Sequence, residues 1–223
     1  MALNINGTTG ISGVDGSVSA PALTGTDSNT GITFPSADTI KFATGGVERM
    51  AITNSGITGI TAGITMADQW RRTANLSLNA AENFLTTDWE RVDTSGQGTL
   101  PVSTDTSNLM SQSGGIFTFP STGIYKVEWQ CYFEDTGSSP VNVADIYVTT
   151  DNNTYATRAT SITSVENVGT YSYGAVHCQT LVDVTDETQV KVKFRVYASG
   201  SVVVDTSSND NRNCATFIRL GNT

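Results

Sequence analysis

Residues 124–133 read Ile-Tyr-Lys-Val-Glu-Trp-Gln-Cys-Tyr-Phe, and this stretch decides the fold class. Large apolar side chains occupy the odd-numbered positions, whereas positions 126, 128 and 130 are polar. Successive side chains of a β-strand point to opposite faces of the sheet. The stretch therefore predicts a strand with one buried face and one polar face. The positions predicted to be buried are Tyr125, Val127, Trp129, Cys131 and Phe133.

Residues 189–196 show the same alternation and predict a second strand of this kind. Turn sequences rich in Gly, Pro, Asn and Asp separate further apolar runs, which predicts an antiparallel β-sandwich. The further strands are expected at 83–92, 115–119, 141–149, 155–163, 171–184, 201–205 and 214–220. The core predicted from these strands adds Phe119, Val190, Val192, Phe194, Val196 and Phe217.

The composition excludes several classes of protein. The 223 residues include 35 Thr, 22 Ser and 21 Gly, which favour strands and turns over helix interiors. A formal net charge of −9 opposes binding to phosphate backbones, so we expect no nucleic-acid partner. No apolar run approaches the roughly 18 residues of a membrane span, and the N-terminus lacks the pattern of a secretory signal. We therefore expect no membrane insertion.

Three cysteines, Cys131, Cys178 and Cys214, do not suggest a disulfide framework, because the count is odd in a chain of this length. No Cys-x-x-Cys spacing supports a zinc site. We expect the three thiols to act as small apolar side chains on the inner faces of strands. A bond between Cys178 and Cys214 stays open, since no residue pattern selects it.

The composition changes near residue 66. Residues 1–66 contain neither Trp nor Tyr, and their only aromatic residues are Phe34 and Phe42. A segment with so few large side chains cannot form a hydrophobic core of its own. Short apolar stretches between Gly, Thr, Ser and Asn indicate very short strands and tight turns, with a flexible linker as the alternative. We predict an extended β-rich arm or shaft over 1–66, ordered by other chains, and a head domain over 67–223.

Three stretches of the second part resemble a known family. Residues 115–125, Gly-Ile-Phe-Thr-Phe-Pro-Ser-Thr-Gly-Ile-Tyr, resemble the Phe-x-x-Pro-x-x-Gly-x-Tyr strand–turn–strand of complement-type and tumour-necrosis-factor-like jelly rolls. Residues 216–221 resemble the last central strand of that family. Residues 184–190 resemble its apolar–turn–apolar hairpin, although Glu187-Thr188 replaces the usual Gly-Asp. The resemblance covers most of 68–221 and implies a jelly-roll head that assembles as a homotrimer.

The first part has a resemblance of its own. Residues 21–32 and 38–52 resemble segments of virion proteins from marine tailed bacteriophages. The second segment contains Thr-Gly-Gly-Val-Glu-Arg-Met-Ala-Ile, which is similar to strings in tail-fibre shafts. The resemblance implies a fibre-type shaft followed by a jelly-roll head.

Catalytic groups are scarce in the sequence. His177 is the only histidine, and Cys178 beside it should point to the other face of the expected strand, which disfavours a Cys–His dyad. Neither a Gly-x-Ser-x-Gly elbow nor a phosphate-binding or dinucleotide-binding loop is present. A carboxylate pair acting on a glycosidic bond stays open, because such pairs form only in space. We predict a protein that is not an enzyme and that has neither catalytic residues nor a cofactor.

Two loops, 151–153 and 205–211, are rich in oxygen ligands of the kind that calcium takes. Neither has the spacing of a calcium loop, and Asp, Asn and Ser are ordinary turn residues, so we predict no metal site. Tyr171, Tyr173 and His177 are the candidates for contacts at the surface or between subunits. The two tyrosines could stack on sugars, but we favour packing on a neighbouring subunit.

Two functions fit an arm joined to a head. The first is a structural virion protein of a tailed bacteriophage, a short trimeric tail fibre whose head contacts a receptor or glycan on the host cell. The alternative is a trimeric capsid decoration or head-fibre protein. In both, the arm binds other virion proteins, and the protein is assembled in the bacterial cytoplasm and resides in the virion. The shaft-like string at 38–52 favours the tail fibre.

Overall fold

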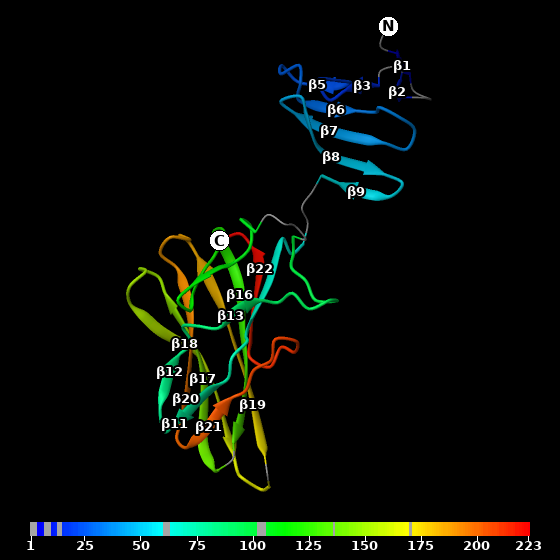
Figure 1. The fold of residues 1–223 in the computed structure, drawn as a ribbon. Coiled ribbons are helices and arrows are strands. Elements are labelled where there is room, and N and C mark those ends of the chain that lie inside the picture. Colours follow the sequence, from blue (N-terminus) through cyan, green and yellow to red (C-terminus); the bar gives the residue numbers. More distant parts are fainter. Residues whose placement is uncertain are drawn as a thin grey trace. The chain divides into compact units, whose positions relative to one another are not determined.

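The computed structural model describes residues 4–6, 10–12, 15–59, 63–101, 106–135, 137–169 and 171–223, and these residues form strands and turns without any helix. The described part of the chain accordingly has no helix that is long and apolar enough to cross a membrane. The chain divides into two compact units, residues 1–62 and 63–223 (Figure 1). The predicted all-β fold class is confirmed.

The smaller unit consists of short antiparallel strands. β1 pairs with β2 and β3 pairs with β4, while β5 to β9 form a five-stranded sheet in which each strand pairs with the next one along the chain. The very short strands and tight turns predicted from the sequence are present. The strands are β1 (Asn4–Asn6), β2 (Gly10–Ser12), β3 (Gly16–Ser17), β4 (Ala20–Pro21), β5 (Leu23–Thr24), β6 (Gly31–Thr33), β7 (Ile40–Thr44), β8 (Val47–Thr53) and β9 (Gly56–Thr58).

A two-residue turn joins β7 to β8. Gly45 and Gly46 have φ angles of 59° and 74°, in the left-handed region that a tight hairpin turn requires at both central positions. Thr44 and Val47 flank the turn as paired residues. The shaft-like string at 38–52 therefore contains one β-hairpin, and its two glycines make the turn.

The larger unit is a sandwich of two antiparallel sheets. The first sheet has seven strands and the second has six. The strands of the first sheet are β10 (Met66–Arg72), β11 (Leu76–Asn79), β13 (Trp89–Arg91), β16 (Gly123–Asp135), β19 (Ser172–Val184), β21 (Ser201–Val204) and β22 (Cys214–Gly221). Those of the second are β12 (Glu82–Phe84), β14 (Ser111–Ser113), β15 (Ile116–Thr118), β17 (Ser139–Thr149), β18 (Tyr155–Val165) and β20 (Lys191–Ala198).

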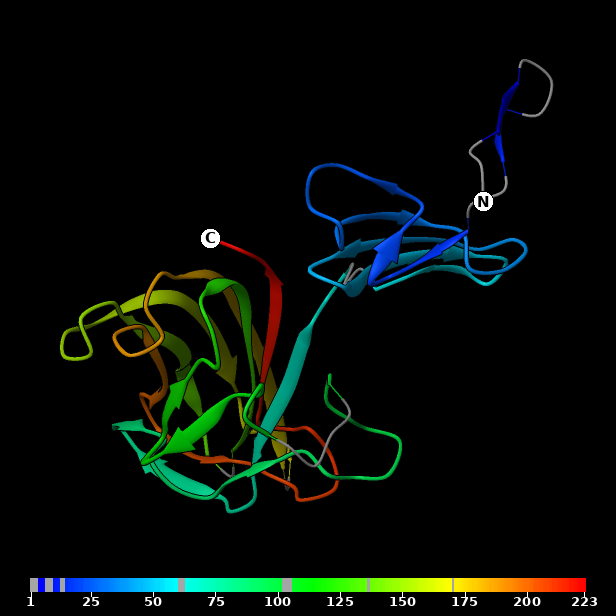
Figure 2. The same ribbon diagram turned by 90° about the horizontal axis from the view of Figure 1, so that it is seen from above.

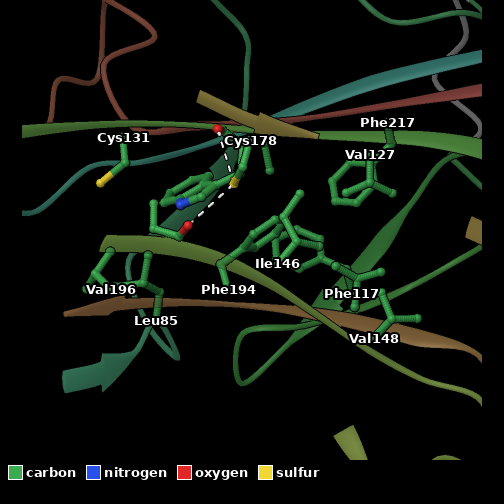
Figure 3. Close-up of a cluster of buried hydrophobic side chains, with 14 of the residues drawn as sticks. Leu85, Phe117, Val127, Cys131, Ile146, Val148, Cys178, Phe194, Val196 and Phe217 are labelled. Atoms are coloured by element: carbon green, nitrogen blue, oxygen red, sulfur yellow. Dashed lines mark hydrogen bonds between the residues drawn. The ribbon is translucent and has the colours of Figure 1, made fainter. Parts of the chain in front are cut away.

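One apolar core lies between these two sheets, which face each other across the sandwich (Figure 2). Trp129 of β16 stacks on Phe194 of β20 with 4.9 Å between ring centroids, so the two layers meet through aromatic rings. Figure 3 shows Phe194, Phe117 and Ile146 among the side chains that fill this space. No residue of the predicted core exposes more than 1% of its surface: Phe119, Tyr125, Val127, Trp129, Cys131, Phe133, Val190, Val192, Phe194, Val196 and Phe217.

The jelly-roll string at 115–125 is the connection from β15 to β16, and its geometry explains its residues. Gly123 has a φ of 144°, and a Cβ there would lie 2.5 Å from the carbonyl oxygen of Gly221. Only glycine fits such a close approach of two strands. The Tyr125 hydroxyl donates to the Ser121 carbonyl at 2.9 Å and holds the turn closed. The ring of Tyr125 packs 4.6 Å from that of Phe119.

The predicted strand 83–92 is wrong as a single element. It is two strands in different layers, because β12 pairs with β20 in the second sheet whereas β13 pairs with β10 in the first. The intervening residues carry the chain from one layer to the other, and Asp88 there has a left-handed φ of 62°. Apolar residues lie on both sides of the crossing, at Phe84 and Leu85 and at Trp89 and Val92, so hydropathy did not separate the two strands.

The first strand of the head, β10, has no counterpart among the predicted strands. Its buried residues include Asp68, Arg71 and Arg72. Charged residues are seldom buried, so the hydropathy pattern does not indicate a buried strand here. Met66 opens β10 and is 2% exposed within the head core. The division of the structure after residue 62 thus lies four residues before the expected end of the arm.

Candidate functional site

His177 lies on the outer face of the first sheet, where it pairs with Gln130 of the neighbouring strand. It lines a hollow of about 270 Å³, which we call the polar hollow. Strands β10, β16, β19 and β22 and a loop before β22 contribute to it. Its lining residues are Gln69, Glu128, Gln130, His177, Asn211, Cys214 and Thr216.

Hydrogen bonds fix the amides of the polar hollow. Gln69 Nε2 donates to Thr216 Oγ1 at 3.0 Å, and Gln130 Nε2 donates to the Asn211 carbonyl at 2.8 Å. Glu128 forms an ion pair with Lys126 next to it on the same face. The polar hollow therefore offers hydrogen-bond donors and acceptors to the polar surface of a partner. The sequence predicted that Gln130 and Glu128 lie on the polar face of the strand. It did not predict that Asn211 lines the same hollow.

Cys178 and His177 do not form a nucleophile–base pair. Cys178 is buried at 5% exposure on the inner face of β19, while His177 is exposed on the outer face. Burial raises the pKa of the Cys178 thiol to about 12, so the thiolate is disfavoured at neutral pH. The predicted separation of these two side chains is confirmed.

The three cysteines are free and buried. Cys178 pairs with Trp129 and Cys214 pairs with Gln130, so the two thiols lie on opposite faces of the same sheet. A Cys178–Cys214 disulfide is therefore excluded in this fold. The expectation that all three thiols face inward is wrong for Cys214, which lines the polar hollow instead.

Tyr171 and Tyr173 form an exposed aromatic pair at the start of β19. Their ring centroids are 6.5 Å apart with 26° between the ring planes, and 57% and 60% of their surfaces are exposed. Desolvation, followed by the nearby charges of Glu134 and Asp205, raises the pKa of Tyr173. His177 lies four residues further along the strand, roughly 13 Å away at the usual rise of a strand. The structure thus joins the two tyrosines to each other and leaves His177 separate.

The two acidic loops are stabilised as turns. Asp151 Oδ1 accepts hydrogen bonds from Thr149 Oγ1 at 2.7 Å and from the backbone N–H groups of Asn153 and Thr154 at 3.0 and 2.7 Å. In the second loop, Arg212 forms an ion pair with Asp205. Among the residues that the structure describes, no three His, Cys, Asp or Glu side chains are grouped to hold a metal ion.

A buried carboxylate that the sequence did not reveal fixes the edge of the head. Asp68 is 1% exposed and accepts hydrogen bonds at 3.1 Å from Arg91 Nε, Trp70 Nε1 and the Met110 backbone N–H. Burial raises the pKa of Asp68, and the hydrogen bond from Arg91 opposes that shift. Three donors satisfy the carboxylate, so we interpret it as a structural tie between strands.

Comparison with known proteins supports the fold of the larger unit. The chain matches no known family model and no curated protein. It is similar to the crystal structure of murine APRIL at pH 5.0, with 14% identity, a TM-score of 0.48 and coverage of 70% of this chain and 98% of that chain. It is also similar to Eiger TNF from S. frugiperda, with 11% identity, a TM-score of 0.51 and coverage of 72% and 95%. At such identities the similarity shows the fold alone, and the fold assignment rests on the comparison with Eiger TNF. The larger unit therefore has a jelly-roll fold like that of tumour necrosis factor.

Proposed function

We propose that this chain is a structural virion protein of a tailed bacteriophage, a short trimeric tail fibre whose jelly-roll head contacts the host cell surface. The observation that carries the proposal is the union of two unlike β units in one chain. A small sheet of shaft-like sequence precedes a sandwich that has its own core. The string similar to fibre shafts contains the β7–β8 hairpin of the smaller unit, which is the first unit along the chain.

The head suits a contact role better than a catalytic one. Its outer surface carries a hollow lined by amides, which offers hydrogen bonds to a polar receptor or glycan, and an exposed tyrosine pair that can pack on a neighbouring subunit. The thiol beside the single histidine is buried and faces away from it. The protein is accordingly proposed to bind without transforming its partner.

The first unit is proposed to attach the head to other virion proteins. Its described strands are two to seven residues long, and its largest sheet has five strands. The unpaired backbone groups at the edges of a sheet can form hydrogen bonds with strands of neighbouring chains. A closed three-fold assembly would bring three copies of these strands together.

Labelling of intact particles tests the proposal. Gold-tagged antibodies against the head should mark the tail, and quantitative gels should give tens of copies per particle. Labels over the capsid in hundreds of copies would instead assign the protein to capsid decoration. Absence of the protein from purified particles would overturn both roles.

Binding to the host tests the contact role separately. Purified protein should sediment with isolated host envelopes and should block adsorption of the phage. Light scattering should give the mass of three chains at micromolar concentration. A stable monomer would contradict the trimer, and a trimer without affinity for envelopes would contradict the adhesive role.

A further inference from the structure

The five-stranded sheet of the smaller unit has two unlike faces. Strand register places Leu23, Ile32, Phe42 and Met50 in one row across β5, β6, β7 and β8, because these residues are direct cross-strand partners. The next row on the same face is Ile40, Ile52 and Ile57 of β7, β8 and β9. We call these seven residues the apolar face.

The opposite face is small and polar. Its rows include Thr33, Lys41, Ala51 and Thr58, and Ala43 with Glu48. Lys41 and Glu48 form an ion pair at 2.7 Å on it. A sheet that folds by itself in water would bury large side chains and expose small polar ones.

Burial in this sheet runs opposite to that rule. The nearly inaccessible residues are Thr33, Ala43 and Ala51, at 0%, 2% and 2% exposure, and all three lie on the polar face. Residues of the apolar face keep much of their surface, with Leu23 at 42% and Ile57 at 61%. The sheet therefore presents its largest side chains outward.

The exposed apolar surface is large enough to bind a partner. Ile40 and Ile52 are each 37% exposed, as is Phe34, which lines a hollow of about 420 Å³ with them. Together with Leu23 and Ile57, these side chains expose on the order of 400 Å². That area is comparable to the largest apolar patch on a typical monomer, about 300–600 Å², which is often functional, and it is about half of the roughly 800 Å² that each partner contributes to a standard interface.

The chemistry of the face restricts what can cover it. None of its seven residues carries a charge or a side-chain hydrogen-bonding group, so a partner must offer an equally apolar, extended surface. Every copy of the chain carries such a surface. The exposed apolar residues of the described head are instead distributed over several strands, as with Ile116, Ile162 and Leu181 on β15, β18 and β19.

We infer that the apolar face packs against the same face of further copies of this chain, so that the sheets of the assembly enclose a shared core. The inference rests on the proposed trimer and names the surface that builds its first unit. Joining the faces covers the large apolar side chains that the described residues of the smaller unit leave exposed. The smaller unit spans only residues 1–62, a size at which a single core is marginal, and oligomerisation is a usual remedy for small domains.

A matched pair of cysteine variants tests this inference in the full-length chain. Ile57→Cys places a thiol on the apolar face, and Thr58→Cys places one on the polar face of the same strand. Both positions are exposed, and the three native cysteines are buried and free, so the new thiol is the accessible one. Each variant is treated with a short bismaleimide and resolved on a denaturing gel. Leu23→Cys and Thr24→Cys repeat the comparison at the other edge of the sheet.

Cross-linked dimers are expected from Ile57→Cys, because one accessible thiol in each chain can join only two chains, while Thr58→Cys stays at the background of the unmodified chain. Equal cross-linking of the two variants, or none in either, overturns the shared core. Light scattering on the same samples separates the two claims. A trimeric mass without cross-links refutes only the face-to-face packing, whereas a monomeric mass refutes the proposed trimer as well.

Discussion

Trp129 shows how much of the head depends on a single side chain. It is fully buried, stacks on Phe194 and lies 5.6 Å from the ring of Trp89. Trp129→Ala should lower the free energy of unfolding by about 3–5 kcal/mol, because it removes apolar contacts and leaves a cavity. Urea denaturation followed by circular dichroism measures this loss.

Lys126 is the control for that substitution, since it lies on the same strand and faces the other way. Its side chain is 36% exposed and pairs with Glu128. Lys126→Ala should cost less than about 1 kcal/mol, the usual range for an exposed ion pair. Similar losses for both variants would mean that the strand phase is wrong.

Asp151 should make stability sensitive to acid. Hydrogen bonds from Thr149 and from the backbone of Thr154 and Asn153 hold its pKa well below the usual value of 3.8. A carboxyl whose folded-state pKa is lowered stabilises the fold above its unfolded pKa and loses that contribution as the pH falls. The contribution of Asp151 is therefore complete above about pH 5 and declines progressively below pH 4.

The test is the variant Asp151→Asn, whose amide oxygen can still accept the turn's hydrogen bonds but does not titrate. Melting temperatures of both proteins are measured at pH 7 and at pH 3. The wild type should be the more stable protein at pH 7, and the difference should shrink at pH 3. A difference that is the same at both values would assign the effect of Asp151 to turn geometry alone.

At the scale of elements, the connection from β15 to β16 decides how the two sheets join. Gly123 has a left-handed φ, and a Cβ at this position would meet the backbone of Gly221 on β22. Gly123→Ala should therefore cost about 1–3 kcal/mol or more, through backbone strain and displacement of a central strand. Chemical denaturation measures the loss.

Gly98→Ala is the matched control, because no atom lies within 4 Å of a Cβ built there. This change should leave stability within about 0.5 kcal/mol of the wild type. If Gly123→Ala is equally mild, the strand–turn–strand string is not explained by close approach of the backbone.

At the scale of the whole molecule, the larger unit should fold without the smaller one. A chain that begins at Gly63 keeps the whole of β10 and the core that contains Met66. It should unfold in one cooperative transition. A chain that begins at Ala67 lacks the buried Met66 side chain and should be less stable by about 2 kcal/mol or more.

Calorimetry of the two truncated chains distinguishes these expectations. Loss of cooperative unfolding in the chain from Gly63 would show that the head needs the first unit. Equal stability of the two chains would show that Met66 contributes little to the core, and it would favour the boundary after residue 66 that the composition predicts.

The sequence by itself determined the features that depend on local periodicity. Alternation along 124–133 and 189–196 predicted which side chains enter the core, because a strand turns every second residue to the same face. Thr, Ser and Gly predicted an all-β chain, and the lack of Trp and Tyr before residue 66 separated two parts. The resemblance of the Phe-x-x-Pro-x-x-Gly-x-Tyr string to tumour-necrosis-factor-like jelly rolls predicted the jelly roll. The close strand approach at Gly123 in the structure explains the glycine of that string.

Tertiary structure alone decided which of these local faces meet. The polar hollow joins Gln69 to Thr216 and Gln130 to Asn211, residues that are 147 and 81 positions apart. Asp68 is charged, so the sequence does not predict that it is buried. Its burial depends on hydrogen bonds from Arg91, Trp70 and the Met110 backbone N–H, which the fold brings together. The apolar face of the first unit likewise depends on register, because its residues are scattered singly along the sequence. Periodicity sets the direction of a side chain, but strand order and register set its neighbours, and those are fixed only when distant segments pair.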